Sequence, residues 1–193
     1  MHLAVFTKPM PSAPDFRLTP AVYNKHRENC EQTRQSLLDR GMQVETPEAV
    51  VNNARRARLI GTFSLVKGDI MCYSAQNQYE KLYVGEGSDA IRSLLLWGYE
   101  DDAKRMIPPV LESARQGLMC HRAGIKLQLL NHYFWLTREA EYVRAEQHRW
   151  LPEVQRILSD RAPKTGLLPR ERYRGDVGTL FITCAPMPTL GEG

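Results

Sequence analysis

The sequence lacks the cysteine and histidine patterns that hold metals or redox-active disulfides. Its four cysteines are far apart in the chain and none belongs to a CxxC pair, and no two of its five histidines form an HxxxH pair. A zinc site or a thioredoxin-like motif is therefore not supported. Isolated thiols are typical of a reducing compartment, with a long-range disulfide as the alternative. We predict a protein with no metal and no cofactor, and favour a cytoplasmic location.

Long apolar runs are also missing. No stretch approaches the roughly 20 apolar residues that a membrane span needs. The N-terminus has no charged region followed by an apolar run, and Pro9, Pro11 and Pro14 interrupt its limited hydrophobicity. We therefore predict a soluble protein without a signal peptide and without a membrane partner.

Charge of one sign is not concentrated anywhere in the chain. The 26 basic and 22 acidic residues give a net charge of +4, with mild arginine clusters at residues 55–58 and 170–174. Neither cluster is a basic stripe interleaved with aromatics, so we predict no nucleic-acid partner. With 42% hydrophobic residues among 193, the chain can form one globular domain with a core.

Helix signals begin after a proline-rich N-terminal segment. Thr19-Pro20 is a typical helix start, and Gly41 is a typical end. The same punctuation at Thr46-Pro47 predicts a second helix that ends at Gly61. We expect an extended segment over residues 1–18 with a short strand at 2–6, a helical domain over 19–183, and a loosely ordered tail over 184–193.

The central part of the chain predicts two pairs of helices. Ser88 or Asp89 is expected to cap a helix that ends at Gly98. The next helix opens with three acids at residues 100–102, contains Pro108-Pro109, which should kink or divide it, and ends near residue 117. A second pair is expected over residues 124–137 and 139–159. The two pairs resemble each other, which predicts a repeat of roughly 40 residues. The alternative is that any two antiparallel helix pairs look this similar.

A polar, aromatic-rich loop precedes the first of these pairs. Residues 77–89 combine two amides, two tyrosines, two glutamates and two glycines without apolar periodicity. A loop of this kind beside a buried helix is a common place for a binding or catalytic site. The alternative is that Ser88 and Asp89 cap the helix and that the glutamates are solvated.

Four segments carry a family resemblance. They are the entry from Gly41 to Thr46-Pro47-Glu48, the loop NQYEKLYVGEGSDA, the turn WGYEDDAKR, and TGLLP followed by YRGDVG. Over about residues 20–180 the chain resembles the six-hairpin glycosidases, the (α/α)6 toroids that include glucoamylase-like and bacterial α-L-rhamnosidase-like enzymes. The resemblance implies an all-α fold of antiparallel helical hairpins. A complete toroid has six hairpins, so we expect a partial (α/α) toroid, and the second catalytic carboxylate of a later hairpin would be missing.

Hydrolysis of a glycosidic bond takes two carboxyl groups, one of which protonates the leaving oxygen. Glu80 lies between two tyrosines, which could raise its pKa as a general acid needs, and it matches the position of the acid in the family's loop. Glu86, between two glycines, and Asp176 are the other candidate catalytic residues. The candidate substrate-binding residues are Asn77, Gln78, Tyr79, Tyr83 and Trp97. In the alternative, Glu80 pairs with Lys81 or an arginine, Glu86 belongs to a helix cap, and Asp176 is a turn residue.

Other enzyme chemistries have little support. The sequence has no GxSxG elbow, no P-loop, and no GxGxxG after a strand. A cysteine nucleophile paired with His121, His132 or His148 stays open but has no local signature. We therefore predict a glycoside hydrolase-like protein, whole or truncated, that acts on a carbohydrate. The alternative is a non-catalytic helical module that binds a carbohydrate or a protein. The uncovered apolar faces of a partial toroid would favour homo-oligomers.

Overall fold

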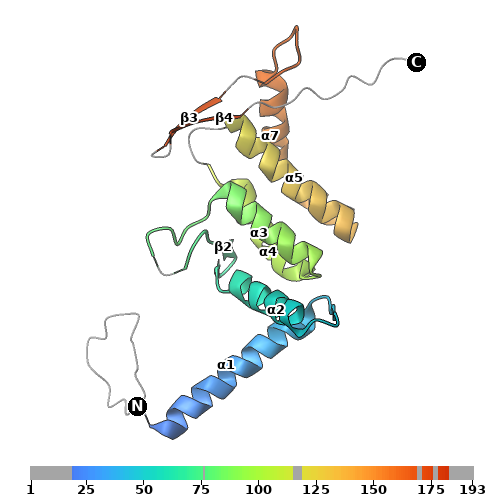
Figure 1. Cartoon of the computed structure of the whole chain (residues 1–193). Helices are drawn as coiled ribbons and strands as arrows, with labels where there is room; N and C mark the ends of the chain where they lie inside the picture. Colours follow the sequence, from blue (N-terminus) through green and yellow to red (C-terminus); the bar gives the residue numbers. More distant parts are fainter. Residues whose placement is uncertain (1–18, 76, 115–118, 169–170, 176–177, 183–193) are drawn as a thin grey trace. The chain divides into compact units, whose positions relative to one another are not determined.

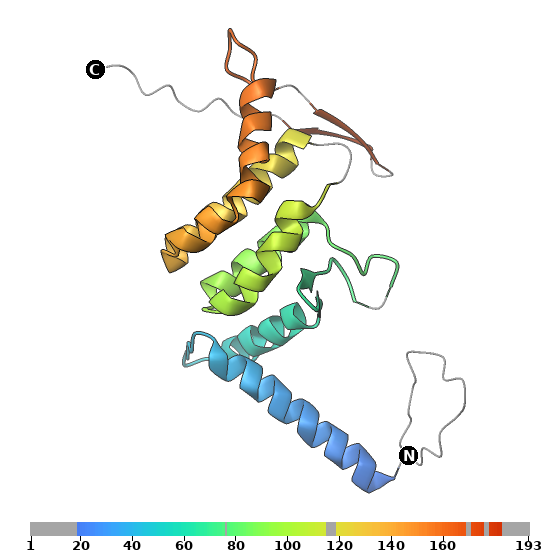
Figure 2. The ribbon, with the colours of Figure 1, turned by 180° about the vertical axis from the view of Figure 1, so that it is seen from behind.

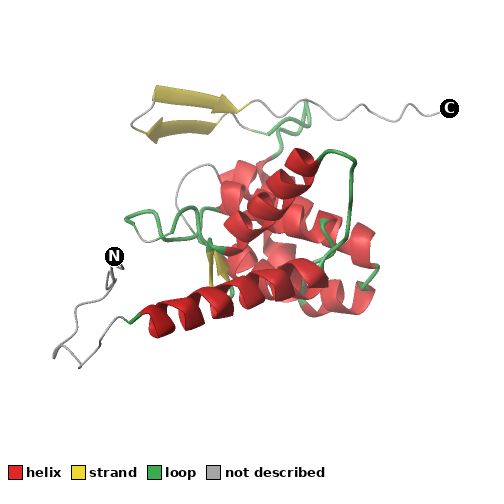
Figure 3. Cartoon of the chain, turned by 60° about the horizontal axis from the view of Figure 1, so that its bottom comes forward, coloured by secondary structure: helices red, strands yellow, loops and turns green. Residues whose placement is uncertain are grey.

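The computed structural model describes residues 19–75, 77–114, 119–168, 171–175 and 178–182. The chain divides into two compact units, residues 1–60 and 61–193. The described residues are mostly helical, as the sequence predicted (Figure 3). They form seven helices. None of these helices has both the length and the apolar character needed to cross a membrane. The predicted strand at residues 2–6 and the predicted tail at 184–193 lie outside the described residues.

The first unit contains α1 (Pro20–Arg40), which begins where the sequence predicted. Thr19 is the N-cap, and its side-chain oxygen accepts a hydrogen bond of 3.2 Å from the Val22 amide. Proline occupies the first helical position, where its missing N–H costs nothing. After the helix, the Gly41 N–H donates to the Leu38 carbonyl. Thr19-Pro20 and Gly41 are therefore confirmed as start and stop signals.

The second helix, α2 (Ala49–Phe63), starts in the first unit and ends in the second. Asn52 holds its entry, because its side-chain amide donates to the Thr46 carbonyl and accepts from the Thr46 N–H, at 2.8 and 2.9 Å. The prediction that Gly61 ends this helix was wrong. Gly61 is not among the glycines with positive φ, the conformation in which glycine usually closes a helix. It stays helical, and the helix continues for two more residues.

The second unit begins with a small hairpin and two helices. The strands β1 (Val66–Lys67) and β2 (Ile70–Met71) pair antiparallel, with Gly68 at φ 61° in the turn. They lead to α3 (Val84–Leu96) and α4 (Glu100–Glu112), which are joined by a short turn with Gly98 at φ 79°. The prediction that Ser88 or Asp89 caps α3 was wrong, because the N-cap is Tyr83, five residues before Ser88. The acids at 100–102 do form the first turn of α4.

The second pair of helices consists of α5 (Met119–Thr137) and the nearly continuous α6 (Ala140–Ala145) and α7 (Gln147–Asp160). From behind, α7 is seen beside α5 (Figure 2), and the two pack together. The chain then forms an antiparallel hairpin of β3 (Glu171–Gly175) and β4 (Gly178–Ile182). These two short hairpins are the only sheets in the described part of the chain.

Helix α4 tolerates two internal prolines. The sequence predicted that Pro108-Pro109 kinks or divides it, and the helix is not divided, since α4 is one helix up to Glu112. Pro108 has no N–H to donate to the carbonyl of Lys104, one helical turn earlier. The Tyr142 hydroxyl donates to that carbonyl at 3.0 Å. A side chain from the next hairpin thus replaces the missing backbone bond.

The two helix pairs stack in the same direction. Helix α3 packs against α4 and α5, and α4 packs against α7 (Figure 1). At the start of α3, a Cβ on Gly85 would contact Ile125 of α5. Nearer the end of α3, the charge of Arg92 acts on His132 of α5. In both pairs the two residues are forty positions apart in the chain. The second helix of each pair shows a similar spacing, because Lys104 of α4 contacts Tyr142 of α6 and Glu112 of α4 contacts Arg149 of α7. These contacts follow the repeat that the sequence predicted.

The core lies between these helices. Most of its most deeply buried side chains come from α3, α4 and α5, with Met71 of β2 beside them; those of the helices include Ile91, Leu94, Met106, Ile107, Val110, Leu129 and Tyr133. No residue of α7 is fully buried, although it presents an apolar stripe to α5. The core therefore fixes α3 firmly, and with it the loop that leads into α3.

Candidate functional site

The candidate site is the tyrosine loop, residues 72–83, which joins β2 to α3; residue 76 lies outside the described residues. Two backbone hydrogen bonds hold its base. The Cys72 N–H donates to Leu65 at 2.9 Å, and the Tyr73 N–H donates to Lys81 at 3.0 Å. The loop therefore starts and ends at fixed points next to the first turn of α3.

Close packing under the loop depends on a glycine. Gly87, in the first turns of α3, is buried, and a Cβ there would lie 2.7 Å from the Leu82 side chain and 3.3 Å from the Met71 carbonyl. A side chain at this position would force the end of the Leu82 side chain to move and would press on the Met71 carbonyl. The sequence indicated close approach of the backbone at this place, and here the approaching groups belong to the protein itself.

Three tyrosine rings gather on the loop. Tyr73 lies 5.2 Å from Tyr83 and 5.9 Å from Tyr79, and Tyr79 lies 6.5 Å from Tyr83, measured between ring centroids. These separations and the tilted ring planes are typical of favourable aromatic contacts. Tyr73 and Tyr79 are nevertheless 48% and 44% exposed. The cluster thus presents aromatic surface to solvent instead of filling the core.

The two amides of the loop differ in what they do. Asn77 donates to the Ser74 hydroxyl at 2.6 Å and accepts from the Tyr79 N–H at 2.8 Å, which is the pattern of an Asx turn. It therefore shapes the loop. Gln78 is exposed beside it. Both amides stand on the same loop as the tyrosines, as the sequence predicted.

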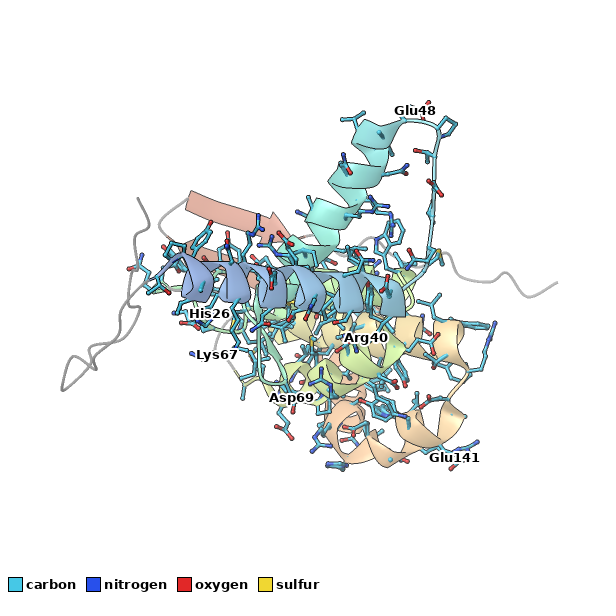
Figure 4. All side chains as sticks on the ribbon, turned by 90° about the horizontal axis from the view of Figure 1, so that it is seen from below. His26, Arg40, Glu48, Lys67, Asp69 and Glu141 are labelled. Carbon is cyan, nitrogen blue, oxygen red and sulfur yellow. The ribbon has the colours of Figure 1, made fainter. Side chains whose placement is uncertain are left out.

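Glu80 forms an ion pair that the sequence did not predict. Its carboxylate lies 3.0 Å from the ammonium of Lys67, on β1, and about a third of its side chain is exposed (34%). Lys67 and Asp69 belong to the β1–β2 hairpin and are labelled in Figure 4. The partner of Glu80 is thus neither Lys81 nor an arginine. This position is less enclosed than the aromatic-walled pocket expected for a general acid.

Glu86 lies in the first turn of α3 and is exposed. The positive end of the helix dipole stabilises a carboxylate at this place. Ser88, in contrast, is buried, and its hydroxyl has no hydrogen-bond partner among the described residues. Ser88 therefore does not cap the helix together with Glu86, and this part of the alternative interpretation was wrong.

Two candidate residues are not placed with the loop. Trp97 follows the last residue of α3, so the whole helix separates it from Tyr83, a distance of about 20 Å at 1.5 Å per residue. Asp176 lies outside the described residues. The structure thus brings Asn77, Gln78, Tyr79, Glu80 and Tyr83 together on one loop, with Glu86 on the following turn.

The sequence analysis missed two members of this site, Lys67 and Tyr73. The signal for them was the run Val66-Lys67-Gly68-Asp69-Ile70-Met71, in which a Gly-Asp turn between two short segments that each contain an apolar residue is typical of a β-hairpin. Such a hairpin returns the chain on itself. It therefore places Lys67 beside the loop that follows Met71.

A cysteine nucleophile finds little support in the site. Burial, followed by the negative charge of Glu80, raises the pKa of the Cys72 thiol. A thiol with a raised pKa is a poor nucleophile at neutral pH. Cys120, the other buried cysteine among the described residues, contacts the Asp160 carboxylate at 3.3 Å. Within the part of the chain that the structure describes, no cluster of side chains could hold a metal ion.

Comparison of the chain with protein-family models, with curated proteins and with solved structures gives no match.

Proposed function

We propose that the protein is glycoside hydrolase-like and acts on a carbohydrate at the tyrosine loop. The observation that carries the proposal is the group of three tyrosine rings, with two of them exposed, next to Gln78, Glu80 and Glu86. The C–H face of a sugar ring is apolar and stacks on aromatic rings, while its hydroxyls need donors and acceptors. The loop offers both kinds of group within a few residues.

The proposed reaction uses Glu80 and Glu86. Glu80 protonates the leaving oxygen, and Glu86 acts as the second carboxylate, on water or on the sugar carbon. A proton donor must reach the leaving oxygen, and the Glu80 carboxylate is engaged by the Lys67 ammonium at 3.0 Å. Substrate must therefore separate this ion pair before Glu80 can act as an acid.

The stacking of the helix pairs supports the part of the proposal that concerns the fold, a partial (α/α) toroid. Two helical hairpins follow each other in the same direction, with α3 beside α5 and α4 beside α7. This is the arrangement expected for neighbouring hairpins of a partial (α/α) toroid. In such a toroid the loop that enters an inner helix faces the sugar, and the tyrosine loop enters α3.

The second candidate is a non-catalytic module that binds a carbohydrate through the same loop. The observation that favours it is the solvent access of both carboxylates, together with the engagement of Glu80 by Lys67. In this alternative the ion pair positions the loop, and the tyrosines bind the sugar without chemistry. Both candidates use the same surface.

Hydrolysis of a panel of aryl glycosides distinguishes the two candidates. We expect turnover of at least one sugar by the full chain and a loss of roughly a hundredfold or more in Glu80→Gln, the size of a general acid–base contribution. The control is Glu141→Gln on α6, whose side chain is 89% exposed and which should keep full activity. Equal turnover in the parent and Glu80→Gln would exclude Glu80 as the acid. A folded chain without turnover would favour the binding module.

A further inference from the structure

The turns of the two helical hairpins present side chains that the proposed glycosidase chemistry does not use. One turn joins α3 to α4, and the other joins α5 to α6. Because α3 and α5 pack together and run in the same direction, both turns lie at the same end of the second unit (Figures 1 and 2). The tyrosine loop enters α3 at the opposite end of that helix.

Large apolar side chains are exposed at both turns. Leu96, the last residue of α3, is 61% exposed, and Leu136, which lies forty residues later in the corresponding position, is 45% exposed. Trp135, next to Leu136, is 56% exposed. Single exposed apolar residues are ordinary, but a group of them is typical of an interaction site.

The indole of Trp135 is held in place although it is exposed. Its Nε1–H donates to the Asn131 side-chain oxygen at 3.1 Å, and the Phe134 ring meets it edge-on, 5.7 Å away between centroids. The guanidinium carbon of Arg138 lies over the indole, 4.3 Å from its centroid. An aromatic side chain that is already fixed loses little conformational freedom on binding, which favours association.

Arg138 occupies a backbone position that usually belongs to glycine. Its φ is 62°, and the corresponding residue of the first hairpin, forty positions earlier, is Gly98 with φ 79°. Residues with a side chain are disfavoured in this left-handed region. The Arg138 N–H donates to the Phe134 carbonyl at 2.7 Å and so closes α5 as a glycine would. Such a conformation at a residue other than glycine points to a role for its side chain.

The charges at the two turns are opposite in sign. The Arg138 side chain is exposed, and among the described residues it contacts aromatic rings but no carboxylate. At the other turn, Glu100 and Asp101 are exposed in the first turn of α4, and neither forms an ion pair within the described part of the chain. One turn thus offers a cation, and the neighbouring turn offers two acids.

We propose that two copies of this chain associate through this end of the second unit. We call it the turn surface and define it by Leu96, Glu100, Asp101, Trp135, Leu136 and Arg138. A two-fold interface uses the same surface on both protomers, so that surface must be complementary to itself. The turn surface meets this condition, because Arg138 of each protomer can face the acids of the other, with the apolar side chains between them.

A second copy is the occupant that these observations favour, since one surface carries both the cation and the acids. Tryptophan and arginine are also the residues that most often dominate the binding energy of protein interfaces. The tyrosine loop stays outside this interface, so the dimer is independent of the carbohydrate proposed for that loop.

Sedimentation equilibrium of the full chain at increasing concentration tests the proposal. We expect the average mass to rise toward that of two chains. Arg138→Glu should weaken the association by roughly tenfold or more, because the two-fold symmetry repeats the repulsive contact at both ends of the interface. The matched control is Lys164→Glu, which makes the same change of charge at an exposed lysine beyond α7. It should associate as the parent does.

A mixture of two variants tests the charge pairing itself. Arg138→Glu and the double variant Glu100→Lys/Asp101→Lys should each associate weakly alone, because like charges then face each other. Mixed together they should form dimers about as well as the parent, since one contact has the original charges and the other has both charges reversed. Circular dichroism of each variant checks that its helices are intact.

Three results would overturn the proposal. The first is a parent chain that stays monomeric at every concentration. The second is equal association of the parent, Arg138→Glu and Trp135→Ala, both exposed positions at which the variants are expected to fold. The third is a mixture of the two charge variants that associates no better than either alone. Because sedimentation needs no sugar, any of these failures would leave the glycosidase proposal untouched.

Discussion

Single residues decide how the tyrosine loop is held against α3. Gly87 is the clearest case, because a side chain there would collide with Leu82 and press on the Met71 carbonyl. The other members of the site are at least partly exposed and depend on this packing for their position. A substitution at Gly87 should therefore change the position of the loop residues, although Gly87 is not one of the proposed ligand-binding residues.

We predict that Gly87→Ala lowers the free energy of unfolding by about 1–3 kcal/mol, the usual cost of adding a group to a filled site. The matched control is Gly124→Ala in α5, where a Cβ would meet nothing within 4 Å. There the change should stabilise the protein by about 0.5–1 kcal/mol, because alanine favours the helix. Urea unfolding of both variants measures these effects. Destabilisation by both, or by neither, would contradict the packing described for Gly87.

How much of the site could be predicted also depends on particular residues. The sequence placed two amides, two tyrosines and Glu80 on one loop, since neighbours in a short loop are neighbours in space. It could not predict the Lys67–Glu80 ion pair, which depends on the turn at Gly68. It also placed Trp97 with the site, although a whole helix separates them.

At the scale of elements, local signals predicted both ends of α1 but neither the start of α3 nor the end of α2. Thr19-Pro20 predicted the start of α1 correctly, because an N-cap forms a hydrogen bond to a residue only a few positions away. Gly61 failed as a stop signal, because glycine only weakly disfavours a helix. Pro108-Pro109 did not divide α4, because tertiary contacts can replace the bonds that proline removes. The Tyr142 hydroxyl is such a contact, thirty-eight residues away from Lys104 in the chain. No short window of sequence contains that information.

The bond from Tyr142 to the Lys104 carbonyl can be tested by a double-mutant cycle. We predict that Tyr142→Phe costs about 1–2 kcal/mol of unfolding free energy, because it leaves the carbonyl without a donor. In a Pro108→Ala background the same change should cost less, because the backbone N–H that the alanine introduces can donate to Lys104 instead. Thermal or urea unfolding of the four proteins gives the coupling energy. A cost of Tyr142→Phe that is the same in both backgrounds would contradict this account of α4.

At the scale of the whole molecule, the second unit is a stack of two helical hairpins with a repeat of about forty residues. Such repeats bury their apolar faces against their neighbours, so each hairpin depends on the next one. The sequence predicted this period, because Trp97 and Trp135 close corresponding helices and acids open the helices that follow. The toroid remains a proposal, since stacked hairpins of this kind are common to closed toroids and open solenoids.

The central claim is that the tyrosine loop recognises a carbohydrate, with or without hydrolysis. The most direct measurement is the affinity of the full chain for a panel of oligosaccharides, compared with Tyr79→Ala and with Tyr23→Ala. Tyr23 is a suitable control, because it is 43% exposed against 44% for Tyr79 but lies on α1. We predict binding of one class of sugar that Tyr79→Ala weakens by roughly tenfold, the effect of losing one aromatic contact, and that Tyr23→Ala leaves unchanged. Equal affinity in all three proteins, or binding of no sugar, would contradict the account.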